Sequence, residues 1–266
     1  MERFLKWAGI LFVAGVVLFN VGPLIVLIGS SFSKSIILEF PPKQWSLDWY
    51  AQAFANDQWI AALGYSTVIA LFVSAIATVV CFLAALVTVR THFRGKFVLE
   101  LLAVSPLVLP HAATALILFR LADSLGLLGD PGGLMLAHSI MAIPFGYLLC
   151  VSGLRKVDMS LEEAAMSLGE PPLGVFRTVT LPLTKTAIVG TFLFSFLLSF
   201  DEATVALFLR GIDTITLPVA IYNEINDNAT PLISAISVLL IVLTILLMWV
   251  AKKLVGLQIF INQRDI

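Results

Sequence analysis

Long apolar stretches separated by short polar ones are the main pattern along the chain. A helix needs about 20 mostly apolar residues to cross ~30 Å of hydrocarbon at ~1.5 Å per residue. Six stretches reach this length and predict six membrane-spanning helices: Trp7–Phe32, Gln58–Val89, Val98–Phe119, Leu134–Leu154, Ala187–Leu209 and Leu232–Ala251. They leave little chain for a soluble domain, so we expect an all-α integral membrane protein with one transmembrane domain over residues 1–266.

The composition excludes several classes of soluble protein. Of the 266 residues, 59% are hydrophobic and 12% charged, and the mean hydropathy is +1.01. Soluble domains are nearer half apolar and about a quarter charged, so a cytosolic enzyme and a disordered chain are excluded. The formal net charge of −1 argues against nucleic-acid binding. Cys81 and Cys150 lie in apolar runs without C-x-x-C spacing, which indicates packing residues and no metal site.

The basic residues predict the orientation of the six helices. The first apolar run is longer than that of a cleaved signal peptide and no A-x-A site follows it, so we expect a retained helix. Twelve of the sixteen Lys and Arg residues lie on the side of the two termini, which the positive-inside rule makes cytoplasmic. These twelve are Arg3, Lys6, Arg90, Arg94, Lys96, Arg155, Lys156, Arg177, Lys185, Lys252, Lys253 and Arg264.

The longest inner segment, residues 155–185, contains signals for a short helix and a turn. Ser160 is followed three residues later by Glu163, which is the capping-box pattern of a helix start. The residues after it favour helix, and Gly169 fits the position just past a helix end. A second short helix is expected from about Pro172, and Pro182 is expected to break the chain before the fifth span.

The same segment resembles a known signature. Permease subunits of binding-protein-dependent ABC importers carry the pattern E-A-A-x3-G-x9-I-x-L-P. The matching residues are Glu163, Ala164, Ala165, Gly169, Val179, Leu181 and Pro182, with Val179 in place of the usual Ile. The resemblance implies the type I importer fold, with coupling helices between spans four and five that dock into a cytoplasmic ATPase. It makes Glu163 the polar contact, Ala164 and Ala165 the close-packing face, and Gly169 the turn.

The resemblance also implies partners. They are a second permease subunit, two ABC ATPase subunits and a periplasmic substrate-binding protein, assembled with lipid in a bacterial inner membrane. This chain lacks G-x-x-x-x-G-K-[ST] and therefore an ATPase site of its own. ATP and Mg are accordingly expected on the partner ATPase subunits, with no cofactor and no enzymatic activity in this chain.

Other segments look like the polyamine branch of this family, which imports spermidine and putrescine. The resembling segments are Leu47–Phe54, Ser105–Pro110, His138 to Pro144, Ser199–Phe208 and Leu217-Pro218. Relatives that import opines, aminoethylphosphonate or other small amines share much of this pattern. We therefore expect an importer of a small organic solute, either a polyamine or related cation, or one of these alternatives.

Two acidic residues, Asp201 and Glu202, fall inside the predicted fifth span. A carboxylate at the centre of a membrane costs about 2.5–3.5 kcal/mol, which suggests a role in a pathway or a compensating partner. At least one of the two is expected to contact a cationic substrate or to gate its passage. The alternative is an ion pair with Arg210, Arg120 or the second permease.

Histidines add one further candidate. His111 follows Pro106 and Pro110, which should loosen the helix locally, so it either lines the pathway or bonds to a neighbouring helix. His138 is expected at the membrane interface. No metal-spaced cluster and no catalytic motif occurs in the sequence, which leaves an intramembrane enzyme without support. A secondary transporter would explain the helices and carboxylates but not the E-A-A loop.

Overall fold

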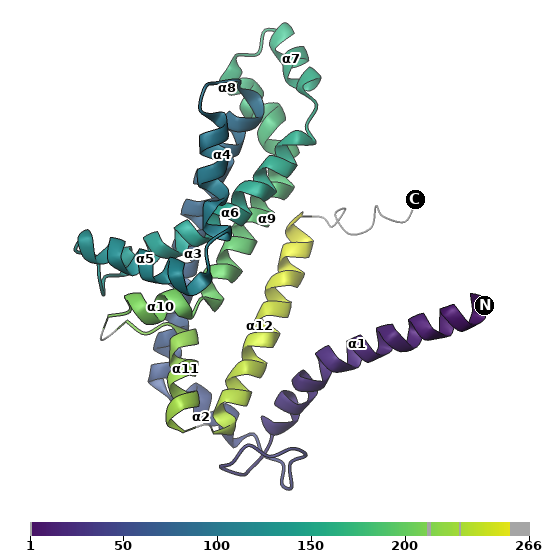
Figure 1. Cartoon of the computed structure of the whole chain (residues 1–266), viewed down its shortest axis with the longest axis vertical. Coiled ribbons are helices and arrows are strands. Elements are labelled where there is room, and N and C mark those ends of the chain that lie inside the picture. The colour runs from purple at the N-terminus through teal and green to yellow at the C-terminus, as the bar shows by residue number, and fades with distance from the viewer. Residues whose placement is uncertain (1, 212–213, 229, 256–266) are drawn as a thin grey trace. The chain divides into compact units, whose positions relative to one another are not determined.

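The computed structural model describes residues 2–211, 214–228 and 230–255, and these are helical apart from loops and one isolated bridge between Ser33 and Trp45 (Figure 1). Arg264, one of the twelve basic residues expected on the cytoplasmic side, lies outside the described residues. The elements are α1 (Glu2–Ser30), α2 (Asp48–Ala55), α3 (Asp57–Arg90), α4 (Lys96–Val104), η1 (Ser105–Leu107), α5 (His111–Ser124), α6 (Pro131–Arg155), α7 (Met159–Ser167), α8 (Pro172–Val175), η2 (Phe176–Thr180), α9 (Leu181–Asp201), α10 (Thr204–Leu209), α11 (Leu217–Asp227) and α12 (Pro231–Val255).

Within the described residues, five helical stretches are long and apolar enough to cross a membrane, or six if one bent pair counts as a single span. The helices α1, α3, α6 and α12 occupy four of the predicted spans. Their lengths follow from continuous apolar sequence, in which every backbone polar group is satisfied inside the helix. The all-α prediction is confirmed for the described residues.

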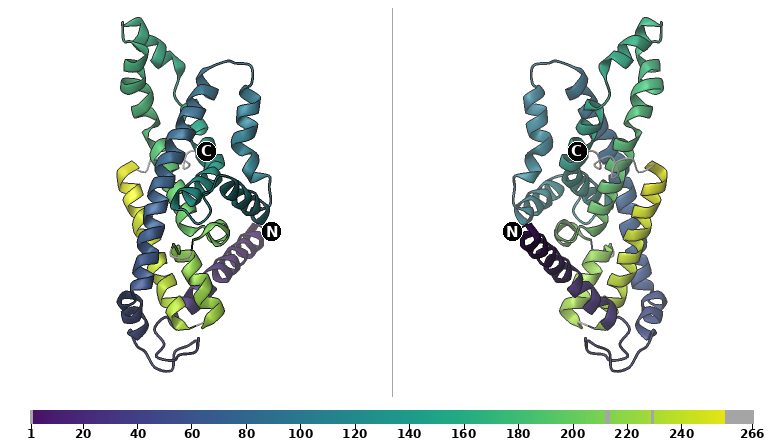
Figure 2. Two further views of the ribbon diagram at one scale, coloured as in Figure 1. Left: turned by 90° about the vertical axis from the view of Figure 1, so that its left-hand side faces the viewer. Right: turned by 90° about the vertical axis from the view of Figure 1, so that its right-hand side faces the viewer.

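The predicted third span is not one straight helix. Its two parts, Lys96–Leu107 and His111–Ser124, are bent by 110° relative to each other. Pro110 has an extended backbone (φ −56°, ψ 135°) at the start of α5, so the first part cannot continue into the second. Figure 2 shows that the chain also turns back between α3 and α4.

The predicted fifth span is also displaced. Helix α9 begins at Leu181 and ends at Asp201, and the short helix α10 follows at Thr204. Glu202, the residue between them, has an extended backbone (φ −75°, ψ 106°), and this ends α9. Asp201 therefore lies at the end of a helix and not inside the single helix predicted over residues 187–209.

The expectation that Pro182 breaks the chain is wrong. The helical run is continuous from α8 through the π-helical η2 into α9, and Pro182 lies in the first turn of α9. Proline is tolerated there because the first turn of a helix does not need its N–H for a helical hydrogen bond. The turn before it is π-helical, so the hydrogen-bond pattern changes at this point. The Thr184 hydroxyl donates to the carbonyl of Thr180 at 2.7 Å across this junction.

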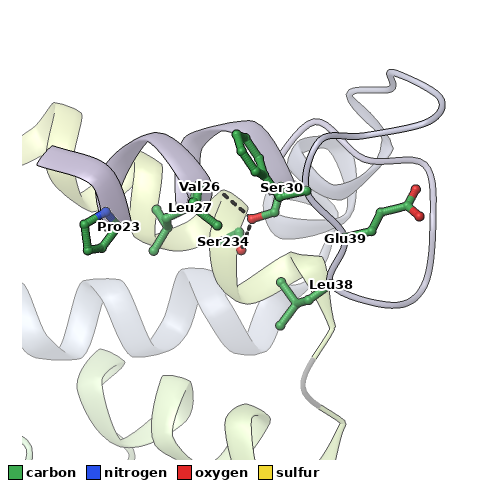
Figure 3. Close-up of a pocket in the computed structure, with 8 residues that line it drawn as sticks. Pro23, Val26, Leu27, Ser30, Leu38, Glu39 and Ser234 are labelled. Carbon is green, nitrogen blue, oxygen red and sulfur yellow. Dashed lines mark hydrogen bonds between the residues drawn. The ribbon is translucent and has the colours of Figure 1, made fainter. Parts of the chain in front are cut away.

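The described residues form two compact units, one from residues 2–60 with 221–246 and the other from residues 61–220 with 247–255. In the first, Ser30 Oγ of α1 donates to Ser234 Oγ of α12 at 3.0 Å. These residues border a cavity of about 400 Å³, whose wall also includes Glu39 of the following loop (Figure 3).

In the second unit, α6 packs along α9. Gly153 of α6 lies so close to Ala187 of α9 that a Cβ on Gly153 would overlap the Ala187 Cβ. Further along the same interface, Cys150 Sγ lies 3.2 Å from Thr191 Oγ1. Small side chains thus allow the close approach of these two helices.

Candidate functional site

The segment between α6 and α9 begins its first helix, α7, at an aspartate cap. Asp158 is the N-cap, and its Oδ1 accepts the backbone N–H of Ser160 at 2.9 Å. Hydrogen bonds from the Ser160 backbone, and then from its side chain, hold the pKa of the exposed Asp158 carboxyl below its ordinary value. The predicted Ser160–Glu163 capping box is therefore wrong, because Asp158 takes the position that Ser160 would have to occupy.

The other end of α7 depends on Gly169. Its φ is +92°, its N–H donates to the Met166 carbonyl at 2.9 Å, and the next N–H, of Glu170, reaches the Ala165 carbonyl at 3.1 Å. This pair of bonds is the Schellman motif, which favours glycine because other residues are strained at positive φ. A Cβ on Gly169 would meet no atom within 4 Å. The predicted turn is confirmed in conformation.

The surface of α7 is open. None of its residues is buried, and Glu163 and Ala164 are exposed while Ala165 is half-buried. Its large apolar side chains are at least 46% exposed, as is Leu168 just beyond it: Met159, Leu161, Met166 and Leu168. An exposed apolar surface of this kind is typical of a protein–protein or membrane contact. Farther along the matched signature, Val179 is half-buried, and Leu181 and Pro182 are exposed.

One charged contact of this loop was not found from the sequence. Arg90, the last residue of α3, lies 3.0 Å from Glu162 of α7, and the two side chains are only 12% and 13% exposed. The pair joins residues 72 positions apart. The sequence pattern contained no local signal for it, since it depends on the fold.

The junction of α9 and α10 brings together the three candidate pathway residues. His111 Nε2 lies 3.0 Å from Glu202 Oε2, and Glu202 Oε1 accepts the N–H of Val205 at 2.9 Å. Glu202 is 8% exposed. Its partner is therefore His111 and not Arg210 or Arg120, the partners named from the sequence within this chain.

Asp201 differs from its neighbour. It is exposed and makes no hydrogen bond or ion pair with the residues that the structure describes. Together with Glu202 it borders a cavity of about 390 Å³, whose other walls are Phe145, Phe194, Leu197 and Leu198. The two phenylalanine rings lie 5.0 Å apart. Aromatic rings, aliphatic walls and a carboxylate without a partner among the described residues suit an alkylammonium group.

The interfacial placement of His138 is wrong. The residue is completely buried in α6, and its Nδ1 lies 2.9 Å from Ser199 Oγ of α9. It thus belongs to the packed α6–α9 interface. The reason is that the imidazole finds a polar partner across that interface, which the position near the end of an apolar run does not reveal.

The sequence from residue 77 to residue 256 matches a known protein family. The family of binding-protein-dependent transport system inner membrane components matches residues 77–256, a range that includes the whole 155–185 loop and the α9–α10 junction. The chain belongs to this family. The resemblance found in the E-A-A loop is thereby confirmed, and the protein is a multi-pass membrane component of a binding-protein-dependent transport system.

Two relatives of known function match most of this chain. The putrescine transport system permease protein PotI of Escherichia coli K12 is 34% identical over 230 residues, which cover 84% of this chain and 82% of the relative. The spermidine/putrescine transport system permease protein PotC of Haemophilus influenzae is 31% identical over 247 residues, covering 93% and 95%.

A solved structure confirms the fold. A bacterial ABC transporter involved in the import of the acidic polysaccharide alginate matches with a TM-score of 0.76 over 95% of this chain and 96% of that one, at 17% identity. At this identity the match concerns the fold and not the solute. The fold is therefore that of an ABC importer permease.

Proposed function

We propose that this chain is one of two membrane subunits of an ATP-driven importer for a polyamine or a related small cation. A soluble binding protein delivers the solute from outside, and one of two ATPase subunits binds the exposed face of α7, at Glu163 and Ala164, and the turn at Gly169 on the cytoplasmic side. ATP and Mg belong to those subunits. Both termini are cytoplasmic in this arrangement, because most basic residues then lie inside.

The observation that carries the solute class is the cavity beside Asp201. The Asp201 carboxylate is unpaired among the described residues, and Phe145 and Phe194 line the same cavity. A primary ammonium group matches the carboxylate in charge, and its alkyl chain matches the apolar walls. Two relatives whose names specify putrescine or spermidine support the same solute class.

Uptake by the complete transporter tests this function. The chain is reconstituted in vesicles with its second membrane subunit, its ATPase subunits and its loaded binding protein, and ATP-dependent uptake is measured. Putrescine and spermidine should be taken up. Uptake of an opine or aminoethylphosphonate in their place would refute the solute class, and uptake without ATPase subunits would indicate a secondary transporter.

Gly169 tests the role of the loop in the same preparation. Gly169→Val places a β-branched residue at positive φ and should reduce stimulation of ATP hydrolysis by the loaded binding protein, or release the ATPase. Gly169→Asn is the matched control, since Asn tolerates this conformation, and should retain most of the stimulation. Glu163→Ala should act more mildly than Gly169→Val. Full stimulation and full ATPase retention in Gly169→Val would contradict the proposed coupling role.

A further inference from the structure

A single carboxylate oxygen connects α7 to two other helical elements. Glu162 Oε1 accepts hydrogen bonds from Arg90 Nε at 3.2 Å and Arg90 Nη2 at 3.0 Å. It also accepts one from Thr180 Oγ1 at 2.9 Å. Arg90 is the last residue of α3, and Thr180 is the last residue of η2, directly before α9. The same Arg90 Nη2 donates to the carbonyl of Val157, just before α7, at 3.1 Å.

This connection is stronger than an ordinary surface ion pair. Both side chains are nearly buried, so solvent screens their attraction less than it would at an exposed site. The carboxylate also receives a hydroxyl hydrogen bond, which helps to offset its loss of hydration. Removal of either charged partner would leave the other charge nearly buried and uncompensated.

Apolar packing holds α7 only weakly. None of its residues is buried, and Arg90 and Glu162 border a cavity of about 330 Å³ that Met166, Val175 and Phe176 also line. The side-chain contacts that join α7 to other elements therefore matter for how a displacement of α7 reaches them. Glu162 supplies the charged one.

We propose that Glu162 and Arg90 are positioning residues that transmit a displacement of α7 to α3 and α9. The proposal rests on the proposed function, in which the ATPase contacts α7. Helical structure is continuous from Phe176 of η2 to Asp201, so a displacement at Thr180 reaches the cavity beside Asp201 along one helix. Neither Glu162 nor Arg90 contacts the solute or ATP in this mechanism.

The test uses the complete reconstituted transporter and four variants: Glu162→Gln, Arg90→Gln, the exchange Arg90→Glu with Glu162→Arg, and Thr180→Val. Three quantities are measured, namely ATPase retained in a pull-down, basal ATP hydrolysis, and stimulation by loaded binding protein. Both single charge-removing variants should retain the ATPase and its basal hydrolysis. Their stimulation by loaded binding protein should fall about fivefold or more, where fivefold is the lower end of the usual coupling between two sites. The exchange should restore most of it, and Thr180→Val should have the smallest effect.

A matched control removes a charge from the same region without touching the pair. Arg94 lies four residues beyond Arg90, is exposed, and makes no ion pair with the described part of the chain. The control variant Arg94→Gln should be stimulated normally.

Two results would overturn the proposal. Normal stimulation in both Glu162→Gln and Arg90→Gln would show that the pair transmits nothing. Loss of the ATPase from these variants would show that the pair only shapes the docking surface. If Gly169→Val also leaves stimulation and retention unchanged, the loop does not contact the ATPase, and the proposed function fails together with the link.

Discussion

At the scale of single residues, two adjacent carboxylates have opposite surroundings. Glu202 is buried between His111 and the Val205 N–H, whereas Asp201 is exposed at the cavity beside Phe145. The sequence shows only two neighbouring acids in an apolar run. The surroundings differ because Glu202 contacts His111, which lies 91 positions away in the sequence. No local pattern could therefore have assigned the two environments.

We predict that Asp201→Asn reduces uptake of a polyamine by about tenfold, equivalent to ~1.4 kcal/mol, because the cavity loses its unpaired negative charge. The measurement is ATP-dependent uptake by vesicles at equal amounts of assembled complex. Asp123→Asn, which removes an exposed carboxylate on α5, is the control and should transport normally. Normal uptake by Asp201→Asn would exclude this carboxylate from solute recognition.

The Asp158 cap gives a pH dependence at the start of α7. Its pKa is below the ordinary value of 3.8, so its stabilising effect is present above that value and is lost as the pH falls through the lower, folded-state pKa. Hydrogen exchange should accordingly show falling protection of the first-turn amides of α7 at such acid pH.

The variant Asp158→Asn keeps a capping oxygen without a titrating group and should show no such pH dependence. Asp158→Ala should lose the protection at every pH. Equal protection in Asp158→Ala and the unaltered chain would contradict the role of this cap.

At the scale of the elements, the contact between α6 and α9 is set by the absence of a side chain. A Cβ on Gly153 would overlap that of Ala187, so the two helices would have to separate locally. We predict that Gly153→Ala lowers stability by about 1–3 kcal/mol, the usual cost of overpacking, measured as thermal unfolding of the purified complex.

Ala187→Gly should compensate, because it removes the atom that the new methyl group would meet. Gly190→Ala on α9 is a matched control, since a Cβ there meets nothing within 4 Å, and should leave stability equal or slightly raised. Equal destabilisation by Gly153→Ala with and without Ala187→Gly would place the cost elsewhere than at this contact.

Sequence reasoning at this scale succeeded where composition alone decides the outcome. Apolar length located α1, α3, α6 and α12, and glycine located the end of α7. The sequence did not predict the breaks in the helices at Pro110 and Glu202. It wrongly predicted a break at Pro182, where the helix continues. A proline can end a helix or begin one, and the choice depends on the packing around it.

At the scale of the whole molecule, the fold gathers basic residues at one end of the second unit. The pairing of Arg90 with Glu162 places the end of α3 beside α7, and α7 directly follows the end of α6 at Arg155. Arg90 and Arg155, two of the inner basic residues, therefore lie at the same end of this unit, which the sequence shows only as a count.

We predict that a reporter active only in the periplasm is active when fused near Ser46, Pro131 or Asn226. The same reporter should be inactive near Gly95 or Gly169, which lie at the basic end. The measurement is reporter activity normalised to the amount of fusion protein. Activity at Gly169 would place the E-A-A loop outside and would contradict ATPase docking.

The bend in the third span has a consequence for assembly. Hydrocarbon offers no hydrogen bonds to irregular backbone, so such backbone at membrane depth must face protein or a water-filled space. Residues 108–110 separate η1 from α5, and Val108 is 81% exposed in this chain. A single copy surrounded by lipid would therefore carry a defect in its outer surface. In the importer proposed above, the second membrane subunit or the water of the pathway has to cover this stretch.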